Sequence, residues 1–214
     1  MQKGKFIVLE GIDGVGKTAQ IGRLAEYIRS LDKYNEVLTA REPTRDAREV
    51  VARLTSERDP NFNALAMAEG YVLYRNTHYL DLIGPTLKAG ADVVCDRFTL
   101  STLAYQGTQG IPLQDLIRMH RVRGLPAPDL TIYLDLSAQL AHQRMHGRGD
   151  AREKFDDIEF QERLGGKYKE IIGLSASDDD LRSLIGRVEV VDAHTSIDEI
   201  ARNIAWLYGS LRTK

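Results

Sequence analysis

A run of eight residues near the N-terminus has the composition of a loop that binds phosphate. Two glycines five positions apart precede a lysine and a threonine, in the order Gly11-Ile12-Asp13-Gly14-Val15-Gly16-Lys17-Thr18. Glycines let the backbone curl until its amide groups converge on phosphate oxygens, and the N-terminus of the following helix adds positive charge. In this pattern the lysine side chain reaches the outer phosphates, and the threonine hydroxyl is a ligand of Mg²⁺. The sequence therefore predicts a site for a nucleoside triphosphate.

Two further clusters of charged residues stand directly after short apolar runs. Arg41 and Glu42 follow one such run, and Asp96 and Arg97 follow another. Arginine suits forked hydrogen bonding to a phosphate, and carboxylates hold Mg²⁺, its water molecules or sugar hydroxyls. Because the glycine-rich loop already serves the triphosphate, two additional arginines predict a second anion. That anion is an acceptor which carries its own phosphate.

These residues need a framework that brings them to one place. Short apolar runs, in which most residues are β-branched, alternate with longer helical patterns. The predicted strands are 6–9, 37–38, 93–95, 130–134 and 188–191, and the predicted helices are 17–30, 46–55, 65–87, 113–123, 137–145, 156–172 and 196–211. Strands separated by such helices predict parallel crossovers, hence an α/β fold with a doubly wound, five-stranded parallel sheet. Ligands of such sheets bind beyond the carboxyl ends of the strands, where the charged clusters stand.

The length and composition of the chain exclude several classes of protein. The chain has 214 residues and no long linker, which predicts a single domain over 1–214. There are 29 Lys and Arg against 31 Asp and Glu, and this balance argues against a nucleic-acid partner. The single cysteine excludes an intrachain disulfide, and no apolar run approaches the ~18 residues that span a bilayer. We therefore expect a cytoplasmic protein with no membrane partner.

Taken together, these segments resemble the thymidylate kinase family. The resemblance covers roughly residues 5–170 and rests on matches in the family's order at 6–18, 41–43, 96–98, 101–107 and 128–135. It implies a P-loop nucleoside monophosphate kinase that phosphorylates dTMP to dTDP with ATP and Mg²⁺. It also implies that the chain forms a homodimer.

The same resemblance assigns roles around the acceptor's phosphate. Asp13 matches the carboxylate that contacts the sugar 3′-hydroxyl and orients the acceptor. Arg41 and Arg97 match the residues that hold the monophosphate. Glu42 and Asp96 accompany them near the Mg²⁺ ion, which Thr18 also ligates.

A second group of residues is implied around the base of the acceptor. Arg75 stands where the family keeps an arginine that hydrogen-bonds the base, and Tyr71 stands where it places a stacking aromatic ring. Tyr74 is a second candidate for the stacking role, so the choice between the two tyrosines stays open here. By similarity the same pocket is lined by Ser101, Tyr105 and Gln106.

A basic segment at about 146–155 is expected to form a lid over the nucleotides. Two glycines surround an arginine in it, as expected of a flexible closing loop. Gly14 stands where some family members carry an arginine in the phosphate loop. Without that arginine the chain resembles the bacterial-type arrangement, in which lid arginines supply the catalytic positive charge. Arg148 and Arg152 are the candidates, with Arg144 as a third beside ATP, and which of them acts is open.

Two other functions are weighed against this one. A different P-loop nucleotide or deoxynucleoside kinase shares the scaffold, but a neutral hydroxyl acceptor needs a base and fewer cations than Arg41 and Arg97 provide. A monophosphate, whose second pKa is ~6, already carries an anionic attacking oxygen at neutral pH. A GTPase-like switch needs an Asn-Lys-x-Asp motif for guanine, which the sequence lacks.

Overall fold

The computed structural model describes residues 3–44, 47, 63–146 and 157–212. Within them, five strands form one parallel sheet in the order β2-β3-β1-β4-β5. The strands are β1 (Phe6–Glu10), β2 (Val37–Arg41), β3 (Asp92–Asp96), β4 (Leu130–Asp135) and β5 (Val188–Asp192). The predicted doubly wound α/β fold is therefore confirmed.

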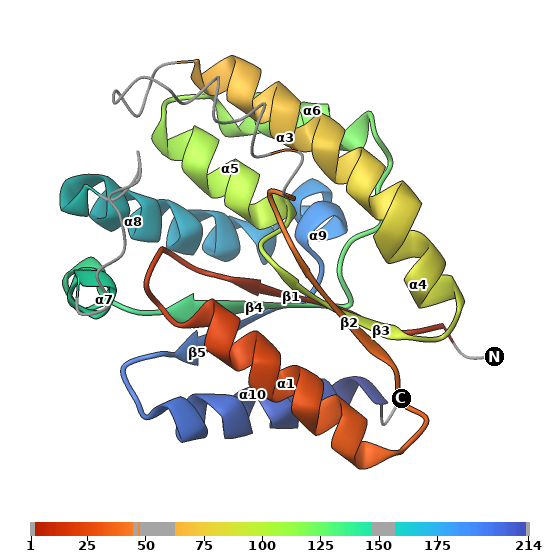
Figure 1. Cartoon of the computed structure of the whole chain (residues 1–214). Helices are drawn as coiled ribbons and strands as arrows, with labels where there is room; N and C mark the ends of the chain where they lie inside the picture. The colour runs from red at the N-terminus through yellow and green to blue at the C-terminus, as the bar shows by residue number, and fades with distance from the viewer. Residues whose placement is uncertain (1–2, 45–46, 48–62, 147–156, 213–214) are drawn as a thin grey trace.

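Helices cover both faces of the sheet (Figure 1). One face carries α1 (Lys17–Leu31) and α10 (Ile197–Arg212), which pack against each other. The other face carries a larger layer, in which α5 contacts α3, α6, α8 and α9. Its helices are α3 (Ala64–His78), α4 (Gly84–Lys88), α5 (Thr99–Thr108), α6 (Leu113–Arg121), α8 (Ile158–Ser175) and α9 (Asp179–Ile185). Helix α7 (Ala138–His146) lies beside α8 at the edge where β1 and β4 end.

The position of β1 determines which charged residues become neighbours. β1 pairs with β3 on one side and β4 on the other, and all five of its residues are buried. Strands buried on both faces are continuously apolar, whereas the edge strands β2 and β5 are partly exposed. Asp96 pairs in register with Leu9 of β1 and with Arg41 of β2. The carboxyl ends of β1, β3 and β2 therefore lie at the same edge of the sheet. The sequence predicted that their charged clusters meet at this edge.

The predicted long helix over 65–87 is divided in the structure. A π-helical turn, η1 (Tyr79–Ile83), separates α3 from α4, and the Gly84 amide donates to the Tyr79 carbonyl, five residues back. Pro85 has no amide hydrogen and its ring crowds the carbonyl four residues before it. The wider π turn accommodates the proline without ending the helix.

Helix α5 was not predicted, and its burial explains why. Every residue from Thr99 to Gln106 is buried, so the segment shows no alternation between an apolar and a polar face. Its N-terminal Thr-Leu-Ser-Thr sequence also has modest helix propensity. Most of the predicted helix at 46–55 and most of the predicted lid lie outside the described residues. No described helix is long and apolar enough to cross a membrane.

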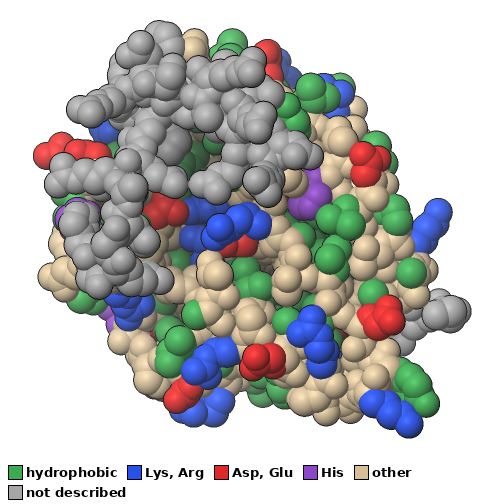
Figure 2. All heavy atoms as spheres, in the orientation of Figure 1, with side chains coloured by type: hydrophobic (Ala, Val, Ile, Leu, Met, Phe, Trp, Pro, Cys, Tyr) green, Lys and Arg blue, Asp and Glu red, His purple; other side chains and the backbone are tan. Residues whose placement is uncertain are grey.

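Space-filling atoms show Lys and Arg interspersed with Asp and Glu over the face in Figure 2. The described part of this face has no broad patch of one sign. That distribution agrees with the balanced composition of the chain.

Helix α8 starts one residue after a capping aspartate. The Asp157 carboxylate accepts a hydrogen bond from the Phe160 amide, 2.9 Å away. We expect Asp157→Ala to lower the free energy of unfolding by about 1 kcal/mol in denaturant titrations, because the first turn loses its cap. Asp157→Asn keeps an equivalent cap and should retain most of this stability. Equal stability losses in both variants would contradict the capping role.

Candidate active site

The glycine-rich loop turns between β1 and α1 through conformations that glycine adopts freely. Gly11, Gly14 and Gly16 have φ angles of 145°, 81° and 98°, in the region that side chains disfavour. The Lys17 ammonium donates to the carbonyls of Gly11 and Ile12, at 3.0 and 2.9 Å. Burial, together with the charge of Arg97, lowers the pKa of Lys17 to about 8. The lysine is thus folded back onto its own loop, at the position from which the sequence pattern predicts it contacts phosphate.

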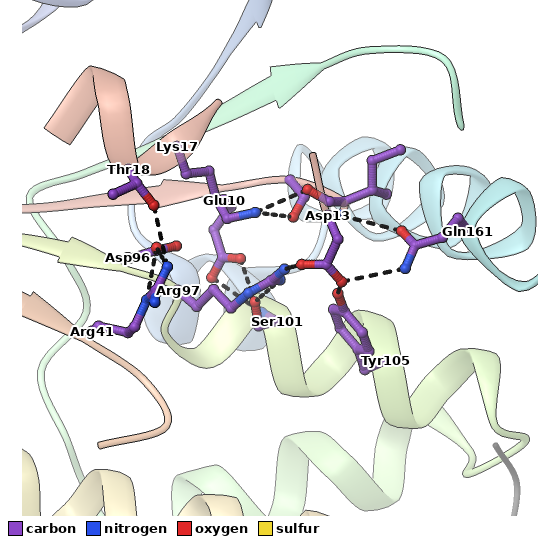
Figure 3. A network of polar contacts seen from close by, with 12 residues as sticks. Glu10, Asp13, Lys17, Thr18, Arg41, Asp96, Arg97, Ser101, Tyr105 and Gln161 are labelled. Atoms are coloured by element: carbon purple, nitrogen blue, oxygen red, sulfur yellow. Dashed lines mark hydrogen bonds and ion pairs between the residues drawn. The ribbon is translucent and has the colours of Figure 1, made fainter. Parts of the chain in front are cut away.

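Asp13, in the middle of this loop, forms an ion pair with Arg97 at the end of β3 (Figure 3). Arg97 Nη2 lies 2.5 Å from Asp13 Oδ1, and the Tyr105 hydroxyl donates to Asp13 Oδ2 at 2.8 Å. Burial alone would raise the pKa of Asp13. The charges of Arg97 and Lys17 outweigh it and hold that pKa well below its usual range. Asp13 is therefore a fixed negative charge between two cations.

Gln161 of α8 holds Asp13 from the other side. The Asp13 amide donates to Gln161 Oε1 at 3.2 Å, and Gln161 Nε2 donates to Asp13 Oδ2 at 3.3 Å. A single side chain therefore fixes both the backbone and the carboxylate of the aspartate. Sequence reasoning missed Gln161, because nothing local to α8 indicates that its amide faces a loop 148 residues away.

Arg97 is held in place by several partners at once. Its backbone has a φ of 69°, a left-handed conformation that a non-glycine residue rarely adopts. Its Nη1 donates to the hydroxyls of Ser101 and Tyr168 at 3.1 and 3.3 Å, and its guanidinium lies 5.0 Å from the centre of the Tyr105 ring. The structure thus brings Ser101 and Tyr105, both predicted to line the acceptor pocket, into contact with Arg97.

Glu10, the last residue of β1, hydrogen-bonds the residues that hold Arg97 in place. It is fully buried and accepts hydrogen bonds from the Phe98 amide, the Ser101 amide and hydroxyl, and the Tyr168 hydroxyl, at 2.6–3.1 Å. Burial raises its pKa despite these donors. Neither Glu10 nor Tyr168 was predicted. An acidic residue ending an apolar strand was the available signal for Glu10, and Tyr168 offered none.

Arg41 bridges Thr18 and Asp96 at the ends of α1 and β3. Its Nη2 lies 2.9 Å from Asp96 Oδ2 and 3.2 Å from Thr18 Oγ1. The Arg41 side chain is 60% exposed, whereas that of Asp96 is 4% exposed. Among the described residues, no group hydrogen-bonds the buried Asp96 Oδ1. Thr18 and Asp96 thus present oxygens to one shared cation.

A second buried cluster surrounds Arg75 on α3. Its Nε donates to Glu42 Oε2 at 2.6 Å, its Nη1 lies 2.9 Å from His120 Nε2, and its guanidinium lies over the Phe98 ring. His78 contacts the other oxygen of Glu42 at 3.2 Å. Phe98 directly follows Arg97, so this cluster adjoins the first one.

The remaining predicted residues divide into four groups. Gln106 is buried, and its Oε1 has no hydrogen-bond partner among the described residues. Tyr71 and Tyr74 are both half-buried on α3, but only Tyr71 lies one turn before Arg75 on the same helix face. Arg144 donates to the Ala193 carbonyl beyond β5, at 3.1 Å. Arg148 and Arg152 lie outside the described residues.

The structure therefore gathers most of the predicted site at one edge of the sheet. There the Arg97 side chain reaches from the end of β3 to Asp13 of the phosphate loop, and Ser101 and Tyr105 of α5 contact this pair (Figure 3). The predicted residues brought together are Asp13, Lys17, Thr18, Arg41, Asp96, Arg97, Ser101 and Tyr105.

A phosphate loop between the first strand and helix of a doubly wound sheet defines an α/β protein of the P-loop nucleotide-binding class. A family model described as thymidylate kinase matches residues 9–204. A thymidylate kinase of Jannaschia sp. (strain CCS1) is 34% identical over 209 residues, covering 95% of each chain. A probable thymidylate kinase of Pyrococcus horikoshii is 34% identical over 210 residues, covering 96% of each chain. The chain belongs to the thymidylate kinase family, as the sequence resemblance indicated.

The close approach of α7 to the phosphate loop explains why position 14 carries a glycine and no arginine. A Cβ atom on Gly14 would lie 2.4 Å from the backbone oxygen of Ala141 in α7, far inside van der Waals contact. We expect Gly14→Ala to lower the melting temperature and to weaken ADP binding about tenfold or more, because the loop or α7 must shift. Calorimetric titration with ADP measures the second effect.

Gly22 of α1 provides the matched control for this substitution. Its Cβ position meets no atom within 4 Å, so Gly22→Ala should leave ADP binding unchanged and stabilise the helix by up to about 1 kcal/mol. Unchanged ADP affinity in Gly14→Ala would contradict the close approach of α7 to the loop.

Proposed function

We propose that this protein transfers the terminal phosphoryl group of ATP to the phosphate of dTMP, giving ADP and dTDP. The observation that carries the proposal is the contact of Arg97 with Asp13, which sets a second cationic group against the phosphate loop. Arg97 is a cation beside the loop in addition to Lys17, and it suits a second ligand that carries its own phosphate. The family membership supports dTMP as the acceptor.

The chain's own residues account for the chemistry by placement and charge. Lys17 and the loop amides receive the β- and γ-phosphates, and Arg41 and Arg97 receive the phosphate of the acceptor. The attacking oxygen is already anionic, so no general base is required. The site's task is to bring two anions into line, to neutralise their repulsion and to exclude water. Asp13 orients the acceptor through its sugar hydroxyl.

The residues at the loop also fit a magnesium ion. Mg²⁺ keeps several waters and takes one or two protein oxygens beside phosphate oxygens, and Thr18 Oγ1 and Asp96 meet that need. Within the described residues there is no cluster of three or more His, Cys, Asp or Glu that would hold an ion without a nucleotide. The ion, when bound with ATP, shields the phosphate charges. Thr18 and Asp96 would hold the ion, and Arg41, which contacts both in this structure, would then be available to the acceptor phosphate.

We assign the binding of the acceptor's base to the buried cluster around Arg75 on α3. Arg75 donates to a base carbonyl, and Tyr71 stacks on the ring, because it shares a helix face with Arg75 and Tyr74 does not. Gln106 offers its buried Oε1, which has no hydrogen-bond partner in the described part of the chain, as an acceptor. Glu42 fixes Arg75 and is not a direct ligand in this scheme.

We assign to the lid the positive charge that stabilises the phosphoryl group during its transfer. Arg148 and Arg152 supply it when the lid closes, and Arg144, held near the loop after β5, belongs to the ATP side. Such a charge is typically worth ~10³-fold or more in rate. No specific observation favours a deoxynucleoside kinase or a GTPase-like switch.

The proposal is tested by supplying purified protein with ATP, Mg²⁺ and a panel of acceptors in a coupled assay for ADP. We expect turnover with dTMP and none with thymidine, because thymidine brings no phosphate to Arg41 and Arg97. Arg97→Ala should raise the KM for dTMP about 10- to 100-fold and lower kcat, with little change in ATP affinity.

Arg187→Ala is the matched control for Arg97→Ala. Arg187 pairs with Glu189 in an exposed ion pair at the start of β5, so its removal should leave both constants unchanged. Turnover of thymidine in place of dTMP would contradict the proposed acceptor. An unchanged KM for dTMP in Arg97→Ala would remove Arg97 from the acceptor site.

We also propose a homodimer built on α3 and η1. Leu65, Leu73 and Leu80 are 54%, 50% and 60% exposed and recur at intervals of eight and seven residues, which places them on one face. Leu73→Asp should shift the protein from dimer to monomer in sedimentation experiments, because burying an unpaired carboxylate is costly. Trp206→Asp, which alters a 72% exposed residue on α10, should leave the oligomeric state unchanged. A wild-type monomer at micromolar concentration would contradict the dimer.

A further inference from the structure

His120 lies near the end of α6, a helix that contributes no residue to the phosphate-binding part of the site. It is 4% exposed, and its two ring nitrogens have different partners. Nδ1 lies 2.7 Å from the carbonyl of Leu116, one turn earlier in the same helix, and Nε2 lies 2.9 Å from Arg75 Nη1. The histidine therefore joins α6 to the arginine assigned to the base of the acceptor.

These two contacts determine the protonation state of the ring. A carbonyl oxygen only accepts hydrogen bonds, so Nδ1 carries the hydrogen and donates to Leu116. A guanidinium only donates, so Nε2 must be the unprotonated nitrogen that accepts from Arg75. Burial and the charge of Arg75 lower the pKa of His120 to about 3, in agreement with a neutral ring.

Arg75 is consequently fixed on two edges and one face. Glu42 takes the Nε edge, His120 takes Nη1, and the ring of Phe98 lies 5.1 Å from the guanidinium carbon. Among the described residues, none accepts a hydrogen bond from Nη2 of Arg75. The guanidinium therefore keeps one edge of donors for a ligand, and the fixed edges determine where those donors point.

A neutral acceptor on the second edge also sets the charge of the cluster. Glu42 already balances the charge of Arg75, so a second carboxylate in place of His120 would leave this buried site with a net negative charge. An aliphatic side chain would leave an Nη1 hydrogen unsatisfied in the interior, which is costly. A neutral imidazole satisfies that hydrogen and keeps the Glu42–Arg75 pair electrically neutral. Such a pair suits a neutral carbonyl on a base.

We propose that His120 is a positioning residue that holds Arg75 in the orientation needed to hydrogen-bond the base of the acceptor nucleotide. This assignment rests on the proposed function, in which Arg75 contacts that base. His120 touches neither nucleotide and acts through Arg75 alone. Its loss should therefore weaken acceptor binding and leave the ATP side unaffected.

The experiment combines steady-state kinetics with calorimetric titration of dTMP. We expect His120→Leu to raise the KM and the Kd for dTMP about tenfold, with kcat within about twofold and an unchanged KM for ATP. His120→Gln places an amide oxygen near the former Nε2, so it should restore the dTMP constants to within about threefold of wild type. His120→Asn is too short to reach Arg75 and should behave like His120→Leu.

Two further variants separate positioning from general stability. Ile117→Ala removes a buried side chain one turn away on α6, so it should lower the melting temperature and leave the KM for dTMP unchanged. In an Arg75→Lys background, His120→Leu should cause no further loss of dTMP affinity, because the partner through which it acts is already altered.

The outcomes distinguish this inference from the proposed function. If wild-type protein turns over dTMP and His120→Leu has the same dTMP constants, the positioning role is wrong while the function stands. Equal effects of His120→Leu with and without Arg75 would also overturn it. If wild-type protein binds no dTMP, the proposed function fails and this assignment fails with it.

Discussion

The ion pair between Arg97 and Asp13 is the interaction on which the rest of the site depends. It joins the end of β3 to the phosphate loop after β1, and the side chains of Arg97 and Asp13 are 14% and 37% exposed, so both are partly withdrawn from water. Removing two charges from water is expensive, and their attraction offsets that cost only when further hydrogen bonds satisfy both groups. Ser101, Tyr168 and Tyr105 supply those bonds, so the pair has one geometry instead of several.

Glu10, which is fully buried, fixes the residues around the Arg97–Asp13 pair. It ends the central strand, accepts from the amides of Phe98 and Ser101 at the start of α5, and binds the hydroxyls that also contact Arg97. The start of α5 and the position of Arg97 are therefore set by one buried carboxylate. The left-handed backbone of Arg97 persists because these contacts over-determine it.

Cations in this site bind protein oxygens where substrate phosphates are proposed to bind. Lys17 donates to two carbonyls of its own loop, and Arg41 spans Thr18 and Asp96. Phosphate binding is then an exchange of one set of acceptors for another. Lys17 and Arg41 therefore have hydrogen-bond acceptors in the protein before nucleotides arrive, and these acceptors offset part of the repulsion among the cations.

The sequence predicted those parts of the site that local chemistry determines. The phosphate loop needs particular residues at particular spacings, and it lies between β1 and α1 as predicted. The charged residues Arg41 and Asp96 lie at the ends of β2 and β3, although β2 extends three residues beyond the predicted 37–38. The binding roles of these residues stay predictions. Residues that act through tertiary contacts were not predicted: Gln161, Tyr168 and His120 each reach a partner at least 45 positions away. Helix α5 was missed because it is buried all round, and the π turn before Pro85 was missed because helical periodicity continues through it.

The central claim is that one crevice holds two anionic ligands, with Arg97 between them and Asp13 fixed beside it. It is tested most directly by calorimetric titration with a single molecule in which adenosine and thymidine are joined through a chain of phosphates. We predict one molecule bound per chain, more tightly than ADP or dTMP alone, with complete loss of binding of both ADP and dTMP to the occupied protein. A conjugate that displaces only one of the two nucleotides, or that binds no more tightly than the better of them, would contradict the account.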